Sequence, residues 1–267
     1  MNEVNKTLFI PLYGKAWVSR RGIILRDATA ERIWDAERFP IRGKAASKWL
    51  AYNMAMRARV FDDWTAEQLA RQPGALVLHI GCGLDSRCAR VERPYALWLD
   101  CDLPEVIAVR RRYYAETERC QMRSLNAADP AQILALPEAE TAVVVLEGLS
   151  MYLTRDELRG LLRSLQDKYR ELHVLMDVYT EFGARASKYR NPVNEVGVTR
   201  LYGLDDLPGL LAGLRLRVRA EHSFTPARLI DELPPAERAV FKLLFTGKMY
   251  GRLYRLFELE TADGPSL

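Results

Sequence analysis

Four short apolar segments stand out in the middle of the chain, at residues 75–80, 95–99, 141–146 and 172–178. Each has the length of a strand and alternates poorly between apolar and polar side chains. Strands that are apolar on both faces are typical of a parallel sheet covered by helices on each side. Because the segments between them have helical length, the pattern predicts repeated β-α-β units.

The intervening segments 103–117 and 155–169 carry apolar residues at helical spacing. The second begins with Thr154 followed by Glu157, which is the pattern of a capping box. A weaker strand is predicted at residues 122–125. These segments supply the helices and a further strand of the α/β arrangement.

The pattern changes after residue 178. Residues 214–224 and 254–261 alternate like strands with one wetter face, and a helical stretch at 235–250 separates them. We expect these strands to form an antiparallel edge of the same sheet, with insertions at about 180–203 and 226–250.

Residues 1–72 contain no strand-like segment, and helix formers dominate residues 45–69. We predict a helical N-terminal extension that covers the core, and a core at 73–267 that forms one compact unit with it. The loop at 189–202, rich in Asn, Pro, Gly and Val, is the expected cover over a pocket.

The chain has 267 residues, of which 49% are hydrophobic, enough for the core of one α/β unit with additions. No segment approaches the roughly 18 uninterrupted apolar residues of a membrane span. The early apolar run at residues 8–11 is too short for the core of a signal peptide. We therefore expect a cytoplasmic protein without a membrane partner.

The net charge of +4 comes with many interspersed acids. The densest basic cluster, residues 110–112, follows an apolar periodic stretch, so we expect a solvated helix end and no nucleic-acid surface. Neither Cys-x-x-Cys spacing nor a histidine cluster is present, which disfavours a metal site and predicts four free thiols. These cysteines are Cys82, Cys88, Cys101 and Cys120.

A glycine turn, Gly81-Cys-Gly83, follows the first apolar segment and lets backbone N–H groups approach a ligand closely. Ser86 stands where a dinucleotide motif has its third glycine, which disfavours a NAD site. The next strand ends at Asp102, whose carboxylate can hold a ribose diol beside the turn. The two features indicate a nucleoside, although Asp102 and Pro104 can also simply begin the following helix.

Three motifs occur in order along the chain: Gly81-Cys-Gly-Leu-Asp-Ser-Arg87, Asp102-Leu-Pro-Glu-Val106 and Glu147-Gly-Leu-Ser-Met-Tyr-Leu153. Together they resemble the leucine carboxyl methyltransferase family and its bacterial relatives in polyketide pathways. The opening at 8–20, with Asp27 and Ala30, is similar to that of family members. The resemblance implies a class I methyltransferase fold, with a mostly parallel Rossmann-like sheet, and S-adenosylmethionine as cofactor.

The resemblance also implies roles for individual residues. Gly81 would lie against the methionyl part of the cofactor, Asp102 would bind its ribose, and Glu147 would face its amino group. Lys15 and Arg57 match basic positions that reach the cofactor carboxylate, although Arg59 competes with Arg57 for that role. The expected cofactor-binding residues are Lys15, Arg57, Gly81, Cys82, Gly83, Asp102, Leu103, Asn126, Ala127, Glu147 and Gly148.

One position departs from the family. Relatives often have an Asp-Leu pair before the fourth strand that contacts the adenine, whereas this chain has Asn126-Ala127. The amide of Asn126 can still face the adenine edge.

The cofactor carries its own activated methyl group, so the protein must mainly orient a nucleophilic oxygen and exclude water. A carboxylate is already ionised at neutral pH and needs no base, whereas a phenol would need one. The chain has three histidines, of which His79 and His173 lie in predicted strands and His222 near the end of another. This scarcity fits a carboxylate acceptor, although a Glu or Asp could also serve as base, and no catalytic residue is predicted.

We therefore expect an S-adenosylmethionine-dependent O-methyltransferase that esterifies a carboxylate of a small molecule, a secondary-metabolite or polyketide-like acid. Three alternatives stay open: methylation of a phenolic or enolic hydroxyl, a catalytically silent cofactor-binding partner protein, and a NAD-binding oxidoreductase. Arg20 is a candidate to hold an anionic acceptor, with Arg21, Lys188 and Arg190 beside the expected cover. Candidates for the acceptor pocket are Tyr152, Tyr179 and Tyr189.

Overall fold

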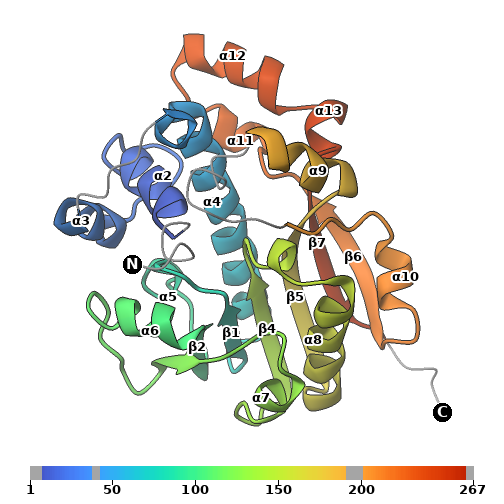
Figure 1. Cartoon of the computed structure of the whole chain (residues 1–267). Coiled ribbons are helices and arrows are strands. Elements are labelled where there is room, and N and C mark those ends of the chain that lie inside the picture. Colours follow the sequence, from blue (N-terminus) through green and yellow to red (C-terminus); the bar gives the residue numbers. More distant parts are fainter. Residues whose placement is uncertain (1–7, 38–42, 191–200, 263–267) are drawn as a thin grey trace.

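The computed structural model describes residues 8–37, 43–190 and 201–262. Within this part of the chain, a seven-stranded sheet has the strand order β3-β2-β1-β4-β5-β7-β6 (Figure 1). The strands are β1 Leu76–Ile80, β2 Leu97–Asp102, β3 Cys120–Ser124, β4 Thr141–Leu146, β5 Glu171–Tyr179, β6 Leu216–His222 and β7 Tyr254–Thr261. All seven predicted strands are present.

Strands β1 to β5 are parallel, and β7 runs antiparallel between β5 and β6, which confirms the mostly parallel sheet with an antiparallel edge. The strand order reverses between β1 and β4, and α/β proteins bind ligands outside the carboxyl ends of the strands at such a point. Strand β2 extends three residues beyond the predicted segment, because the polar Asp100 and Asp102 lie inside the strand.

Helices cover both faces of the sheet (Figure 1). One face packs on α7 (Pro130–Leu134), α8 (Arg155–Lys168) and α10 (Leu207–Leu211), and the other on α4 (Lys48–Arg71) and α11 (Ala227–Ile230). Successive strand residues point to opposite faces: Leu78 belongs to the first core and Val77 to the second. This two-sided burial explains why the strands are apolar throughout.

The N-terminal extension consists of α2 (Phe9–Ser19), α3 (Ala28–Glu37), the short η1 (Gly43–Ala46) and α4. Helix α2 packs on α3 and α4, and α4 in turn contacts β4 and β5. The predicted helix at 45–69 is therefore α4, which begins after the Ser47 cap. This packing brings side chains of α2 and α4 to the carboxyl edge of the sheet.

The remaining helices lie between or beyond the strands. They are α5 Arg87–Arg90, α6 Pro104–Arg110, η2 Ser150–Tyr152, α9 Glu181–Arg190, α12 Pro235–Phe245 and α13 Lys248–Gly251. The capping box predicted at Thr154 is present at the start of α8. The helix predicted at 235–250 divides into α12 and α13, because Gly247 has a φ of 84° that interrupts the helical backbone.

Two expectations from the sequence are wrong. In the basic cluster at 110–112, Arg111 and Arg112 are exposed as expected, but Arg110 is buried. The Arg110 guanidinium pairs with Asp100 at 2.5 Å and donates to the Gly83 carbonyl at 3.0 Å. Cys88 and Cys120 are not free thiols, because the fold brings their Cα atoms to 7.0 Å and their sulfur atoms into disulfide contact. The two other cysteines are buried and free, as expected.

No helix in the described ranges is long and apolar enough to cross a membrane. Residues 191–200 of the expected cover at 189–202 lie outside the described residues.

Candidate active site

The glycine turn after β1 is tied to the end of β2. The N–H groups of Gly81 and Cys82 donate to the Cys101 carbonyl at 2.8 and 3.1 Å, and the Gly83 N–H donates to Asp102 Oδ2 at 2.7 Å. Gly81 has a φ of 75°, and a Cβ there would lie 3.2 Å from the Leu149 side chain. Glycine is therefore required by both the backbone conformation and the space.

Asp102 lies at the carboxyl end of β2 beside this turn. Its Oδ1 accepts from the Leu103 N–H at 2.8 Å, immediately before α6 begins at Pro104. Burial raises the pKa of Asp102, and the backbone N–H groups of Gly83 and Leu103 oppose that shift. The carboxylate thus fixes the turn and the start of α6 together.

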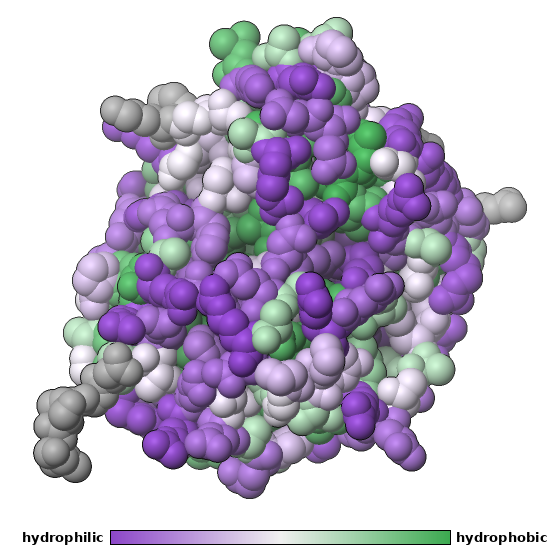
Figure 2. All heavy atoms as spheres, turned by 180° about the vertical axis from the view of Figure 1, so that it is seen from behind, coloured by the Kyte–Doolittle hydropathy of each residue, from purple (hydrophilic) through white to green (hydrophobic). Residues whose placement is uncertain are grey.

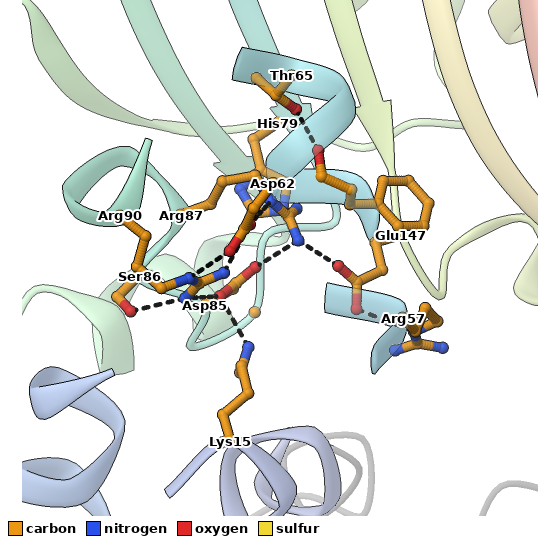
Figure 3. A network of polar contacts seen from close by, with 12 residues as sticks. Lys15, Arg57, Asp62, Thr65, His79, Asp85, Ser86, Arg87, Arg90 and Glu147 are labelled. Atoms are coloured by element: carbon orange, nitrogen blue, oxygen red, sulfur yellow. Dashed lines mark hydrogen bonds and ion pairs between the residues drawn. The ribbon is translucent and has the colours of Figure 1, made fainter. Parts of the chain in front are cut away.

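Arg87 lies at the centre of a buried set of ion pairs next to the turn (Figure 3). Its Nε donates to Asp62 Oδ1 at 2.7 Å, its Nη1 lies 3.1 Å from His79 Nε2, and its Nη2 lies 3.1 Å from Asp85 Oδ2. The same Nη2 also donates to Glu147 Oε2. One fully buried guanidinium therefore joins α5, α4, β1 and the loop after β4.

Asp85 and Arg90 extend these contacts toward the N-terminal extension (Figure 3). Lys15 Nζ from α2 lies 2.7 Å from Asp85 Oδ1, and Arg90 Nη1 lies 2.7 Å from both Asp85 and Asp27. Burial raises the pKa of Asp85, but Arg90, Lys15 and Arg87 outweigh it and hold that pKa well below its usual value. Asp85 is therefore ionised at neutral pH.

Arg57 of α4 lies on the opposite side of Glu147. Its Nε donates to Glu147 Oε1 at 2.9 Å, and its Nη1 donates to the Tyr254 hydroxyl at 2.9 Å and to Asp177 Oδ2 at 3.3 Å. Its Nη2 has no hydrogen-bond partner among the described residues. A Cβ on Gly148 would lie 3.3 Å from this Nη2, so a glycine there leaves space beside it. Within the described residues, Nη2 is thus the edge of this buried guanidinium that carries no hydrogen bond.

We call these nine residues the buried network: Lys15, Asp27, Arg57, Asp62, Asp85, Arg87, Arg90, Glu147 and Asp177. Burial raises the pKa of Glu147, but Arg57 and Arg87 outweigh it and lower that pKa to about 2. The network thus holds ionised side chains in a part of the protein that is shielded from water.

The three histidines are all paired with carboxylates. Burial lowers the pKa of His79, and Arg87 donates to its Nε2, so the neutral ring carries its proton on Nδ1, 3.2 Å from Asp100. His173 Nε2 lies 3.0 Å from Glu171, and His222 Nε2 lies 2.7 Å from Glu258. His79 therefore has the packed, hydrogen-bonded role predicted for a strand histidine, and it offers no free basic nitrogen.

The chain is similar to known proteins over most of its length. Residues 5–166 match the family described as Leucine carboxyl methyltransferase. The chain belongs to the leucine carboxyl methyltransferase family. It is 30% identical over 244 residues to the tetracenomycin polyketide synthesis O-methyltransferase TcmP of Streptomyces glaucescens, covering 90% of each chain.

A second relative is the S-adenosyl-L-methionine-dependent methyltransferase dpfgK of Gibberella zeae, 30% identical over 194 residues, or 66% of this chain and 65% of that one. A putative methyltransferase from Thermobifida fusca has a similar fold, with a TM-score of 0.59, 13% identity and 94% of each chain covered. The magnesium protoporphyrin IX methyltransferase of Synechocystis, crystallised with S-adenosylhomocysteine, has a TM-score of 0.51 and 12% identity. The match covers 88% of this chain and 95% of that one. The protein is an S-adenosylmethionine-dependent methyltransferase with the class I fold.

Several residues that the family resemblance singles out meet at one edge of the sheet. Lys15, Arg57 and Glu147 belong to the buried network, and the glycine turn and Asp102 lie next to it. Arg59, by contrast, pairs with Asp63 at 2.8 Å and is partly exposed. The structure therefore brings Arg57, and not Arg59, to the family motifs.

Asn126 and Ala127 follow β3 at the same edge. The Asn126 side chain is exposed, and its Oδ1 accepts from the Ala128 N–H at 3.0 Å, which leaves the amide nitrogen as the group available to a ligand. The cofactor contacts of all the expected residues, Cys82, Leu103, Asn126 and Ala127 among them, stay predictions.

The candidate acceptor residues are spread over separate elements. Arg20 pairs with Asp35 of α3 at 2.5 Å, away from the network. Tyr152 of η2 is partly exposed, and the Tyr179 ring lies 4.7 Å from the Tyr254 ring. The side chains of Tyr189, Lys188 and Arg190 lie outside the described part of the structure. A role for these residues in acceptor binding stays a prediction.

The sequence predicts no role for several neighbours of the candidate site. Asp85 and Arg87 were quoted only as part of a motif, although two charged residues beside a glycine turn already indicate a buried pair. Asp177 stands within an apolar strand segment, and an acid in such a place is a recognisable signal. Asp62 and Tyr254 show no comparable pattern, because their proximity depends on how α4 and β7 pack.

A cavity of about 870 Å³ opens beside the network, between residues 22–29, α4 and α5. Its lining includes Asp27, Asp62 and Arg90 of the network but neither Gly81 nor Asp102. Figure 2 shows the molecule from behind, where the surface is largely hydrophilic and apolar residues are recessed in the upper half. The cavity borders the network without reaching the glycine turn, so we place the candidate site at the turn and at Arg57.

Replacing Arg87 tests how strongly the network depends on it. Arg87→Gln leaves Asp62, Asp85 and Glu147 without their shared cation, and we expect the free energy of unfolding to fall by about 3–5 kcal/mol. The matched control Arg71→Gln removes an exposed ion pair with Glu67 and should cost about 0.5 kcal/mol or less. Urea unfolding measures both values, and equal losses in the two variants would contradict the central position of Arg87.

Proposed function

We propose that this methyltransferase transfers the methyl group of S-adenosylmethionine to a carboxylate oxygen of a small-molecule acid, giving a methyl ester and S-adenosylhomocysteine. The observation that carries the proposal is the state of the ionisable groups at the site. His79 is neutral with both ring nitrogens engaged, and the pKa values of Glu147 and Asp85 are lowered, which makes these carboxylates weak bases. Burial raises the pKa values of Asp102 and Asp177, but both carboxyl groups are engaged by hydrogen bonds within the fold. Such a site suits an acceptor that is already ionised.

The residues at the sheet edge fit the cofactor. The open Nη2 edge of Arg57 and the free N–H donors of Lys15 would hold the methionyl carboxylate by charge-assisted hydrogen bonds. Glu147 would accept from the ammonium group, and Asp102 from the ribose hydroxyls, as the family resemblance implies. The turn at Gly81 would let the cofactor approach the backbone closely.

The charge of the buried network supports the same assignment. It contains five carboxyl groups and four cationic side chains. A sulfonium ion with one ammonium and one carboxylate group carries a net positive charge, which complements this small excess of acid.

The chemical demands on the chain are then modest. The cofactor supplies the activated methyl group when it is bound. The network fixes the methionyl end, so that the acceptor oxygen can approach the methyl in line with the sulfur, and the packed helices on each side exclude water. No proton has to be removed from a carboxylate acceptor, so the site needs no general base.

The relatives agree with a small-molecule acceptor. TcmP is named for an O-methylation in polyketide synthesis, and the family itself is named for methylation of a carboxyl group. A polyketide-like acid would be an acceptor that fits both names, because it is a polyketide product with a carboxyl group to methylate.

Asp102→Ala tests the cofactor site. The variant loses the proposed contact with the ribose and the bond to the Gly83 N–H, and we expect S-adenosylhomocysteine to bind at least about tenfold more weakly. Isothermal titration calorimetry measures this, with Glu138→Gln on the exposed loop before β4 as a control of unchanged affinity. Equal affinity in wild type and Asp102→Ala would refute the assignment of Asp102.

Incubation with a library of candidate acids and S-adenosylmethionine labelled in its methyl group tests the acceptor. We expect a labelled product whose methyl group is released as methanol by mild alkali, because esters hydrolyse and aryl ethers do not. A labelled product that resists alkali would contradict a carboxylate acceptor and favour the phenolic or enolic alternative. Cofactor binding without any labelled product would instead favour a silent binding protein.

A further inference from the structure

Asp177 is a fully buried acid at the carboxyl end of β5 that no motif explains. Its Oδ1 accepts from the Gly148 N–H at 2.7 Å, and its Oδ2 accepts from Arg57 Nη1 at 3.3 Å and from the Tyr254 hydroxyl. Its backbone carbonyl accepts from the Ser150 hydroxyl. One residue therefore contacts the loop after β4, the guanidinium from α4 and the first residue of β7.

Tyr254 completes the arrangement around Arg57. Its hydroxyl accepts from Arg57 Nη1 at 2.9 Å and donates to Asp177, so the three groups form a closed set of hydrogen bonds. The ring is held in place by Phe224, which stacks on it with centroids 4.4 Å apart and an interplanar angle of 4°. The hydroxyl position is thus fixed by packing as well as by its polar contacts.

Among the described residues, these contacts determine which edge of Arg57 is left without a hydrogen bond. Nε is used by Glu147, and Nη1 is used by Asp177 and Tyr254, which leaves Nη2 beside Gly148. A guanidinium is planar, so fixing Nε and Nη1 also fixes the direction of the Nη2 donors. The Gly148 N–H bond to Asp177 fixes the loop that lies against Nη2, and a glycine there places no Cβ on this edge.

We propose that Asp177 and Tyr254 are positioning residues, which orient Arg57 so that its Nη2 edge receives the carboxylate of the methionyl group. This inference rests on the proposed cofactor contact of Arg57. The pair acts through Arg57 and has no contact of its own with the ligand, so its loss should affect only ligands that carry the amino-acid group.

The test compares two ligands. S-adenosylhomocysteine carries the amino and carboxyl groups, whereas 5′-methylthioadenosine keeps the nucleoside and lacks both. We expect Asp177→Asn to weaken binding of S-adenosylhomocysteine roughly tenfold and Tyr254→Phe to weaken it roughly threefold. Binding of 5′-methylthioadenosine should change by less than about twofold, and KM for S-adenosylmethionine should rise with little change in kcat.

The matched control is Tyr169→Phe, which removes a buried tyrosine hydroxyl that donates to the Pro137 carbonyl at the opposite end of β5. It should leave both affinities unchanged. If thermal unfolding shows that Asp177→Asn does not fold, Tyr254→Phe, which keeps the stacked ring, decides the question.

Arg57→Gln separates the proposed cofactor contact of Arg57 from the positioning role of Asp177 and Tyr254. If Arg57→Gln loses affinity for S-adenosylhomocysteine alone while Asp177→Asn and Tyr254→Phe do not, the positioning role is overturned and the proposed function stands. If Arg57→Gln leaves that affinity unchanged, the proposed contact of Arg57 fails, and the inference fails with it. Equal weakening of both ligands by Asp177→Asn and Tyr254→Phe would indicate general damage to the site and would also overturn the positioning role.

Discussion

The site depends on one fully buried guanidinium. Arg87 lies where α4, β1, α5 and the loop after β4 meet, and it contacts an acid or an imidazole in each direction. Burying a cation costs free energy unless its hydrogen-bond and ion-pair partners are in place. The four elements are therefore favoured in the arrangement that brings these partners around Arg87. We infer that its main effect is to specify geometry, since replacing buried ion pairs by apolar residues often leaves stability unchanged.

The same constraint organises the proposed cofactor site. Glu147 is shared between Arg87 and Arg57, so the position of one guanidinium is transmitted to the other across a single carboxylate. Asp177 and Tyr254 hold Arg57 from its other side. The site is thereby organised before a ligand arrives, which lowers the ordering that binding must otherwise provide.

The sequence predicted local features well and long-range contacts poorly. Strand β4 and the start of α8 were predicted to the residue, because apolar runs and capping boxes are encoded by neighbouring positions. The glycine turn and Asp102 were found for the same reason. The burial of Arg110 was not predicted, because its partner Asp100 comes from β2. The basic residues 110–112 have the local pattern of an exposed helix end. The contact of Arg57 with Tyr254 joins residues 197 positions apart and has no local pattern.

The central claim is that the edge of the sheet at the glycine turn holds S-adenosylmethionine through Arg57 and Lys15 at one end and Asp102 at the other. A crystal structure of the complex with S-adenosylhomocysteine tests it most directly. The account predicts the ligand carboxylate within about 3.2 Å of Arg57 Nη2 and the ribose hydroxyls within the same distance of Asp102. A ligand whose carboxylate contacts neither Arg57 nor Lys15, or whose ribose lies away from Asp102, would contradict it.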